Sequence, residues 1–166
     1  GKFPESSDNA LVQLGHVESA QLRLYHPKEF DRKIVGVDVA RFGSDSSVIT
    51  GLHGYKFISK KSLYKRDLTE VTGEVIAFIS EHFNNKADVI VIDETGLGSG
   101  VVDNLREAQS KGVIHRNTEI RGVQFGASCE SESDREKFVN IKARMFGLLA
   151  DDIKREDGLT LPEEDI

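Results

Sequence analysis

Hydrophobic residues occur in short, dense runs along this chain, separated by polar segments that contain glycine. Residues 34–38 have the sequence IVGVD, and residues 89–93 have the sequence VIVID. Runs that are apolar at nearly every position are typical of strands buried on both faces of a sheet. The pattern predicts five strands, at 33–39, 47–51, 55–62, 87–93 and 119–125. The third is more polar and is expected nearer a sheet edge.

Apolar residues at helical spacing predict helices around these strands. Asp67 is a suitable N-cap, and the positions after it predict a helix that ends at Asn84 and Asn85. The other predicted helices cover about 14–24, the segment through 101–108, and one long helix from about 134 to 156.

The order of the predicted elements indicates the topology. Three strands joined by short loops should be antiparallel, and the two strands that follow helices should be parallel to their neighbours. This order predicts an α/β fold of the ribonuclease H-like type, with a mixed five-stranded sheet in the order 3-2-1-4-5 and helices on both faces. In that order, the first strand lies beside the fourth, so Asp38 and Asp93 would meet at the same end of the sheet.

Composition limits the class of protein. The chain has 166 residues, of which 38% are hydrophobic and 30% charged, as in an ordinary globular domain. We expect residues 31–166 to form that domain and residues 1–30 to be a linker. The net charge of −6 argues against a dedicated high-affinity nucleic-acid binder, but it does not exclude an enzyme that acts on nucleic acid. No membrane-spanning run is evident, and the single cysteine excludes an internal disulfide.

The two strand-terminal aspartates are the strongest candidates for chemistry. A carboxylate at the end of a buried strand must be solvated, paired or metal-bound, and two of them side by side repel unless a cation lies between them. Carboxylate oxygens are the hard ligands that Mg²⁺ and Mn²⁺ prefer. Two such ions about 3.5–4 Å apart would activate water and stabilise the leaving oxygen of a phosphodiester. The alternative is that each aspartate only closes its strand by bonding the next turn.

Four further acids are weaker candidates for the same site. Glu94 should point to the sheet face opposite Asp93, where it would cap the next turn or face a phosphate backbone. Asp45 could approach from a turn, although bonding to its own backbone is the favoured interpretation. Asp151 or Asp152 could complete the site from the last helix, although a solvated helix face is favoured.

Basic residues give candidate contacts to DNA. A dense basic stretch lies on and after the third predicted strand, with a solvated edge strand as the alternative interpretation. The candidates are Arg41, Lys60, Lys61, Lys65, Arg66, Lys142 and Arg144. The glycine-rich loop at 96–100 opens a helix but matches neither a P-loop nor a dinucleotide fingerprint, so a tight strand-to-helix turn explains it better than a phosphate site.

Several motifs together resemble the nuclease domain of the large terminase subunits of tailed bacteriophages. The sequence VGVDVARFGSDSSVI at 35–49 resembles the first nuclease motif of that family, and VIDETGLGSGVVDNL at 91–105 resembles the second. FVNIKARM at 138–145 and LTLP at 159–162 resemble the helix after the fifth strand and the segment that follows it. GKFP at 1–4 resembles the join to the packaging ATPase domain.

The resemblance implies a two-metal endonuclease that cuts concatemeric double-stranded viral DNA during genome packaging. Asp38 and Asp93 match the first two metal-binding aspartates of the family. A third acid is expected beyond Ile166, which would leave this fragment truncated and weakly active or inactive. The implied partners are an upstream ATPase domain of the same polypeptide, the portal protein and the small terminase subunit. The implied location is the cytoplasm of the bacterial host.

Three other functions remain open at this stage. Another ribonuclease H-like nuclease, of the resolvase or integrase type, would also place an acid on its first strand. A sugar-kinase or actin-like ATPase fragment would use an aspartate after the first strand and glycine-rich phosphate turns, but it normally needs two such domains. A catalytically silent docking domain would show no effect of Mg²⁺ or Mn²⁺ at Asp38.

Overall fold

The computed structural model describes residues 10–40 and 45–163, and these residues form two compact units. Unit 1 combines the N-terminal segment up to Pro27, residues Tyr55–Phe57 and the segment from Phe125 onward. Unit 2 comprises Lys28–Gly54 and Ile58–Gln124, and it contains nearly all of the sheet. The sequence pattern does not indicate this division into two units, because unit 1 combines segments from opposite ends of the chain.

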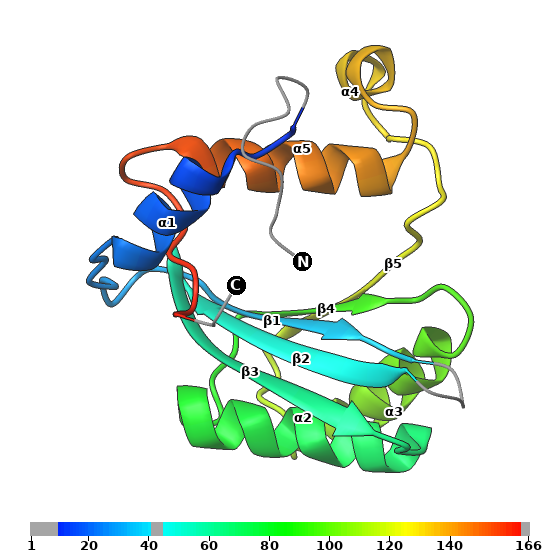
Figure 1. Ribbon diagram of the computed structural model, residues 1–166. Helices are drawn as coiled ribbons and strands as arrows, with labels where there is room; N and C mark the ends of the chain where they lie inside the picture. The colour runs from blue at the N-terminus through cyan, green and yellow to red at the C-terminus, as the bar shows by residue number, and fades with distance from the viewer. Residues whose placement is uncertain (1–9, 41–44, 164–166) are drawn as a thin grey trace. The chain divides into compact units, whose positions relative to one another are not determined.

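The sheet has five strands in the order β3-β2-β1-β4-β5 (Figure 1). β1 pairs antiparallel with β2 and parallel with β4, and β4 pairs parallel with β5. This topology confirms the predicted strand order and the mixed sheet. The strands are β1 (Lys33–Asp38), β2 (Ser46–His53), β3 (Lys56–Tyr64), β4 (Val89–Asp93) and β5 (Glu119–Val123).

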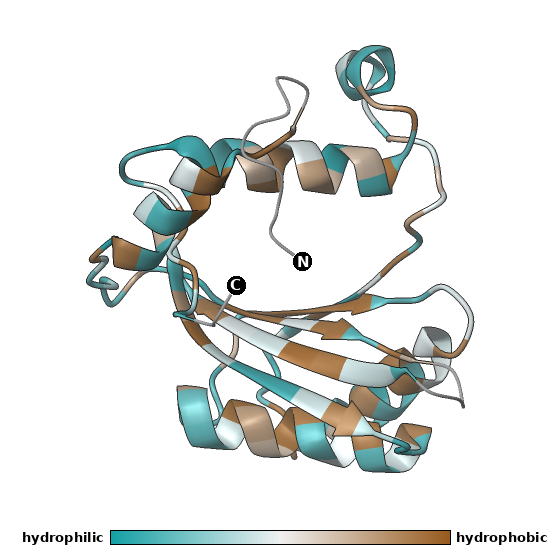
Figure 2. Ribbon diagram, viewed as in Figure 1, coloured by the Kyte–Doolittle hydropathy of each residue, from teal (hydrophilic) through white to brown (hydrophobic). Residues whose placement is uncertain are grey.

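Helices α2 (Leu68–Phe83) and α3 (Gly98–Ser110) pack against one face of this sheet, where they form the core of unit 2. Figure 2 shows brown apolar segments along the strands, whereas α2 carries both apolar and hydrophilic residues. The fully buried side chains of this core include Val35, Ile49, Ile90 and Ile92 from the sheet, Val71, Val75 and Phe78 from α2, and Val101, Val102 and Leu105 from α3. The sequence predicts helices on both faces of the sheet. The other helices of the described residues belong to unit 1.

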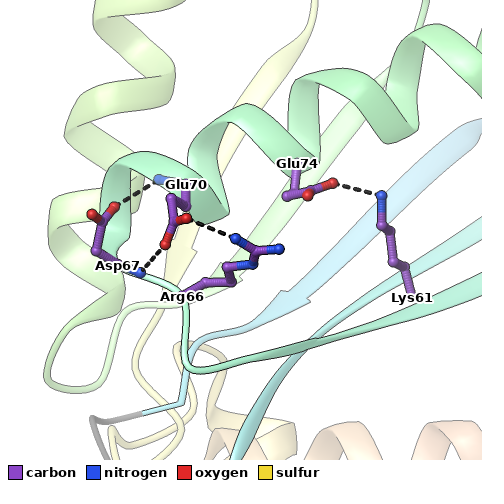
Figure 3. A network of polar contacts seen from close by, with 5 residues as sticks. All are labelled: Lys61, Arg66, Asp67, Glu70 and Glu74. Carbon is purple, nitrogen blue, oxygen red and sulfur yellow. Dashed lines mark hydrogen bonds and ion pairs between the residues drawn. The ribbon is translucent and has the colours of Figure 1, made fainter.

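The start of α2 is held by a capping box that the sequence partly predicts. The Asp67 carboxylate accepts the backbone N–H of Glu70 at 2.8 Å, and the Glu70 carboxylate accepts the backbone N–H of Asp67 at 3.0 Å (Figure 3). Arg66 donates to Glu70 at 2.7 Å, and Lys61 on β3 pairs with Glu74 at 2.5 Å. The bonds between Asp67 and Glu70 satisfy backbone N–H groups at the helix start, and the pair Lys61–Glu74 links β3 to the second turn of α2.

Unit 1 contains α1 (Leu14–Leu22), α4 (Glu132–Lys137) and α5 (Ile141–Lys154). The single long helix predicted over 134–156 is therefore wrong. Phe138 is extended (φ −131°, ψ 132°), and the Asn140 side chain caps α5 by accepting the backbone N–H of Ala143 at 2.8 Å. The apolar spacing continues across this break, so periodicity alone did not reveal it, whereas Asn140 is a recognisable N-cap residue.

The N-terminal and C-terminal parts of unit 1 are bonded to each other. The backbone N–H of Leu161 donates to the carbonyl of Ala20 at 3.0 Å, and Arg23 donates to the carbonyls of Ile153 and Leu159. The backbone N–H of Thr160 donates to the carbonyl of Tyr55 at 2.8 Å. Among the helices of the described residues, none is both long enough and apolar enough to cross a membrane.

Candidate metal centre

Asp38 and Asp93 occupy adjacent positions at the same end of neighbouring parallel strands. Gly36 pairs with Val91 and Val37 pairs with Ile92, so one step further along each strand brings Asp38 level with Asp93. Paired positions on neighbouring strands are separated by about 4.8 Å. The adjacency predicted from the topology is therefore confirmed by the register.

The two aspartates also share one face of the sheet. Val37 and Ile92 belong to the core beneath α2 and α3, and side chains alternate between faces along a strand. Asp38 and Asp93 each follow one of these core residues, so both lie on the face opposite that core. Asp38 is exposed and Asp93 is half-buried. This position leaves their carboxylates open to water while the strands beneath them are rigidly packed.

The turn after β4 holds Asp93 in place. One oxygen of its carboxylate, Oδ1, accepts the backbone N–H of Thr95 at 2.9 Å. The turn passes through Gly96, whose φ of 77° favours glycine, and enters α3 at Gly98. The predicted tight strand-to-helix turn is thus confirmed.

This pair fits a hard divalent cation. Mg²⁺ is commonly bound through one or two carboxylates and keeps several waters or substrate phosphate oxygens as its other ligands. Two carboxylates on adjacent strands supply that minimum. Within residues 10–40 and 45–163, no group of three or more histidine, cysteine, aspartate or glutamate side chains is arranged to hold a metal. The described chain therefore offers a two-carboxylate site, and the role of Asp38 and Asp93 as ligands stays a prediction.

The weaker acidic candidates differ in their positions. The Glu94 side chain lies over Gly122 of β5, since a Cβ built at Gly122 would be 2.6 Å from Glu94 Oε2. Gly122 pairs with the core residue Ile92, so Glu94 lies on the face opposite Asp93, as the strand alternation predicts. Asp45 is exposed and immediately precedes β2.

Asp151 and Asp152 belong to α5 in unit 1. Asp152 is paired with Arg155 at 3.1 Å, and Asp151 is exposed. The favoured interpretation, a solvated helix face, fits both positions. Their participation in the metal site stays an untested prediction.

Most of the predicted DNA-contacting cations already have acidic or aromatic partners. Lys61 and Arg66 pair with Glu74 and Glu70, as Figure 3 shows. Lys65 Nζ lies 5.4 Å from the centre of the Tyr64 ring.

The other cations differ in their surroundings. Arg144 pairs with Asp134 at 2.8 Å, whereas Lys142 is exposed. Lys60 also has an interaction partner, and Arg41 lies outside the described residues. None of these observations tests whether the cations bind DNA, so their role stays a prediction.

The structure adds residues that sequence reasoning missed. Arg121 on β5 pairs with Val91 of β4, so it lies on the same face of the sheet as Asp93. Its side chain is exposed and forms an ion pair with Glu119, with 2.5 Å between Nη2 and Oε1. Alternation in the strand 119–125 would have revealed it once the register was known. Gly98 lies in the glycine-rich loop at 96–100 and Thr95 directly precedes that loop, but their contacts with Asp93 could not be inferred from composition.

Comparison with solved structures identifies the fold. The nuclease domain of the large terminase subunit gp2 of bacterial virus Sf6, solved as a point mutant with manganese and β-thujaplicinol, superposes with a TM-score of 0.74 at 17% identity, over 93% of this chain and 74% of that one. The chain has the fold of a large-terminase nuclease domain. This is the predicted ribonuclease H-like fold, with the strand order 3-2-1-4-5.

A second terminase nuclease, from the thermophilic phage G20c, gives the same result. Its cobalt-bound structure has a TM-score of 0.62 at 16% identity, covering 96% of this chain and 77% of that one. Its magnesium-bound structure has a TM-score of 0.56 at 15% identity, covering 90% and 74%. No protein-family model and no curated protein sequence matches the chain. At these identities, the shared terminase-nuclease fold is the conclusion that the comparisons carry.

Proposed function

We propose that this chain is the metal-dependent endonuclease domain of a phage large terminase subunit, which cleaves concatemeric double-stranded DNA during genome packaging. The observation that carries the proposal is the register of β1 and β4, which brings Asp38 beside Asp93 on one sheet face. The likeness to terminase nucleases solved with manganese, magnesium and cobalt supports the same chemistry.

In this proposal, Asp38 and Asp93 bind Mg²⁺ or Mn²⁺, with two ions in the complete site. A metal held by these two carboxylates would supply a water molecule of lowered pKa and would stabilise the negative charge that develops on the phosphodiester. The protein holds the two carboxylates level with each other, and the packed strands below them keep that spacing constant. No covalent intermediate with the protein is required, because the attacking group is water.

The wider assembly is part of the proposal. An upstream ATPase domain would precede this domain in the same polypeptide, and the portal protein and the small terminase subunit would be partners in the cytoplasm of the bacterial host. A third metal-binding acid would come from a later segment of the subunit. Residues 31–166 would then be the nuclease domain, with residues 1–30 as the entry segment from the ATPase, of which α1 packs within unit 1.

Contact with DNA would use the phosphate backbone. Arg121 lies on the face of the metal site, and Lys142 is exposed on α5. Backbone contacts by arginine and lysine position a nucleic acid without reading its sequence. The net charge of −6 implies that these local cations, rather than a general basic surface, would face the DNA.

The test is Mn²⁺-dependent nicking of plasmid DNA by the intact subunit carrying Asp38→Asn or Asp93→Asn. We expect each substitution to abolish nicking while leaving the folded domain intact by circular dichroism. Asp103→Asn is the matched control, because Asp103 is an exposed aspartate on α3, which packs on the other face of the sheet. Wild-type nicking by both Asp38→Asn and Asp93→Asn would refute the proposal. A calorimetric titration without Mn²⁺ binding would instead favour a docking domain.

A further inference from the structure

The peptide group that follows Asp93 is held on both sides. Only residues 94–97 separate the end of β4 from the first residue of α3, Gly98. A Cβ built on Gly98 would lie 1.7 Å from the carbonyl oxygen of Asp93 and 2.8 Å from its carbonyl carbon. Real Cβ atoms essentially never approach to less than 3.0 Å, and the atoms in the way belong to the backbone. Only glycine fits at this position without moving Asp93.

The other side of the same peptide group is bonded to β5. The backbone N–H of Glu94 donates to the carbonyl of Val123 at 2.9 Å. With its carbonyl against Gly98 and its N–H on Val123, the peptide plane between Asp93 and Glu94 has a fixed orientation. Because a trans peptide is rigid, that plane holds the carbonyl carbon and Cα of Asp93 in place. The pairing of Asp93 with Val123 holds the rest of its backbone, and the two together set the direction in which the Asp93 side chain leaves the strand.

A third contact fixes the carboxylate itself. Asp93 Oδ1 accepts the backbone N–H of Thr95 at 2.9 Å, so the side-chain torsions of Asp93 are also restrained. This bond leaves Oδ2 and the remaining lone pair of Oδ1 available to a cation. Three backbone contacts, from Gly98, Val123 and Thr95, therefore determine where the Asp93 carboxylate lies relative to Asp38.

We propose that Gly98, together with the backbone N–H of Thr95, positions the Asp93 carboxylate for metal binding. The inference rests on the proposed function, because it takes Asp93 to be a ligand. Gly98 and Thr95 act through Asp93, so they are positioning residues. A displaced carboxylate loses the spacing that lets two acids share one ion, and metal affinity falls even when the fold is retained.

The test compares Mn²⁺ affinity, measured by calorimetry on the full chain, with thermal stability. We expect Gly98→Ala to weaken Mn²⁺ binding at least tenfold. Gly100→Ala is the matched control in the same helix, because its Cβ would meet only the flexible end of the Leu68 side chain at 2.8 Å. Gly51→Ala controls for general destabilisation, because its Cβ would crowd the rings of Phe78 and Phe83 in the core. We expect both controls to bind Mn²⁺ as the wild type does, whatever their melting temperatures.

A second variant covers the case in which Gly98→Ala does not fold. Thr95→Pro removes the N–H that bonds Oδ1 without adding volume against the Asp93 carbonyl, and we expect it to weaken Mn²⁺ binding several-fold. Wild-type affinity in Thr95→Pro, and also in Gly98→Ala where that variant folds, together with loss of binding in Asp93→Asn, would overturn the positioning role alone. Unchanged binding in Asp93→Asn would overturn the ligand assignment and the inference with it.

Discussion

Replacing Asp38 with asparagine should stabilise the domain without metal and destabilise it, relative to the wild type, with metal. Asp38 and Asp93 are level on adjacent strands, whose backbones are about 4.8 Å apart, and both side chains lie on the same face of the sheet. Two like charges about 5 Å apart repel by about 0.8 kcal/mol in water and about 3 kcal/mol at an effective dielectric constant of 20. Because Asp38 is exposed, the lower value applies.

The expected gain on removing the charge is therefore up to about 1 kcal/mol in the free energy of unfolding. For a chain of this length, that corresponds to a rise in melting temperature of about 2–4 °C. With bound metal, we expect the wild type to be more stable than Asp38→Asn. At a Mn²⁺ concentration one hundred times the dissociation constant, the wild type gains about 2.7 kcal/mol, and a variant that cannot bind the ion gains nothing.

The assay is differential scanning calorimetry of the wild type, Asp38→Asn and the control Asp103→Asn, at low salt, with and without Mn²⁺. The melting curves of wild type and Asp38→Asn should exchange order when Mn²⁺ is added, and Asp103→Asn should follow the wild type. At 1 M salt, where charges are screened within about 3 Å, the metal-free difference should disappear. An Asp38→Asn variant that melts below the wild type without metal, or that Mn²⁺ stabilises as strongly, would refute the reasoning.

Three further predictions concern stability and substrate. Asp67→Ala should lower the free energy of unfolding by about 0.5–2 kcal/mol in urea titrations, because α2 loses its N-cap; an unchanged midpoint would contradict the capping role. The pKa of Glu70 is lowered by its bonds to the Asp67 backbone and to Arg66, and Ser131 and Arg144 lower the pKa of Asp134. The two carboxylates contribute their full stabilisation above the ordinary pKa of about 4.3 for glutamate and 3.9 for aspartate, and this stabilisation is lost as pH falls through the lowered values. The midpoints of urea unfolding should therefore be constant from pH 7 to 5 and decline below about pH 4. Cleavage of DNA should show little sequence preference when cut ends are sequenced, and a sharp consensus would contradict recognition through the phosphate backbone.

The arrangement of the sheet could be predicted because each strand carries its own local signal. The runs ending at Asp38 and Asp93 are apolar at almost every position, and the order of elements then leaves few topologies open. The observed β1 and β4 end at those same aspartates. The candidate pair follows from the same two facts, which is why its adjacency could be predicted before any coordinates were known.

The features that were missed depend either on contacts between distant segments or on local backbone geometry that apolar spacing does not encode. The bonds from Leu161 to Ala20 and from Arg23 to Leu159 join the two ends of the chain, and no local pattern encodes them. The break between α4 and α5 lies inside a continuous apolar pattern, where an extended Phe138 overrides helical periodicity. The glycine pattern predicts a turn after β4, but it does not predict how closely Gly98 approaches the Asp93 carbonyl within that turn.

The parallel pairing of β1 with β4 has a consequence for biosynthesis. Asp38 and Asp93 are 55 residues apart in the chain (93 − 38), and the two strands between them in sequence order, β2 and β3, both lie on the side of β1 away from β4. At about 5–20 residues per second, a ribosome needs roughly 3–11 s to reach the second aspartate after making the first. A nascent chain that has folded only its first hairpin presents one acid and cannot assemble the pair. The proposed metal site would therefore form only after the helical crossover through α2 has closed, and a product that terminates before Asp93 would lack one of its two carboxylates.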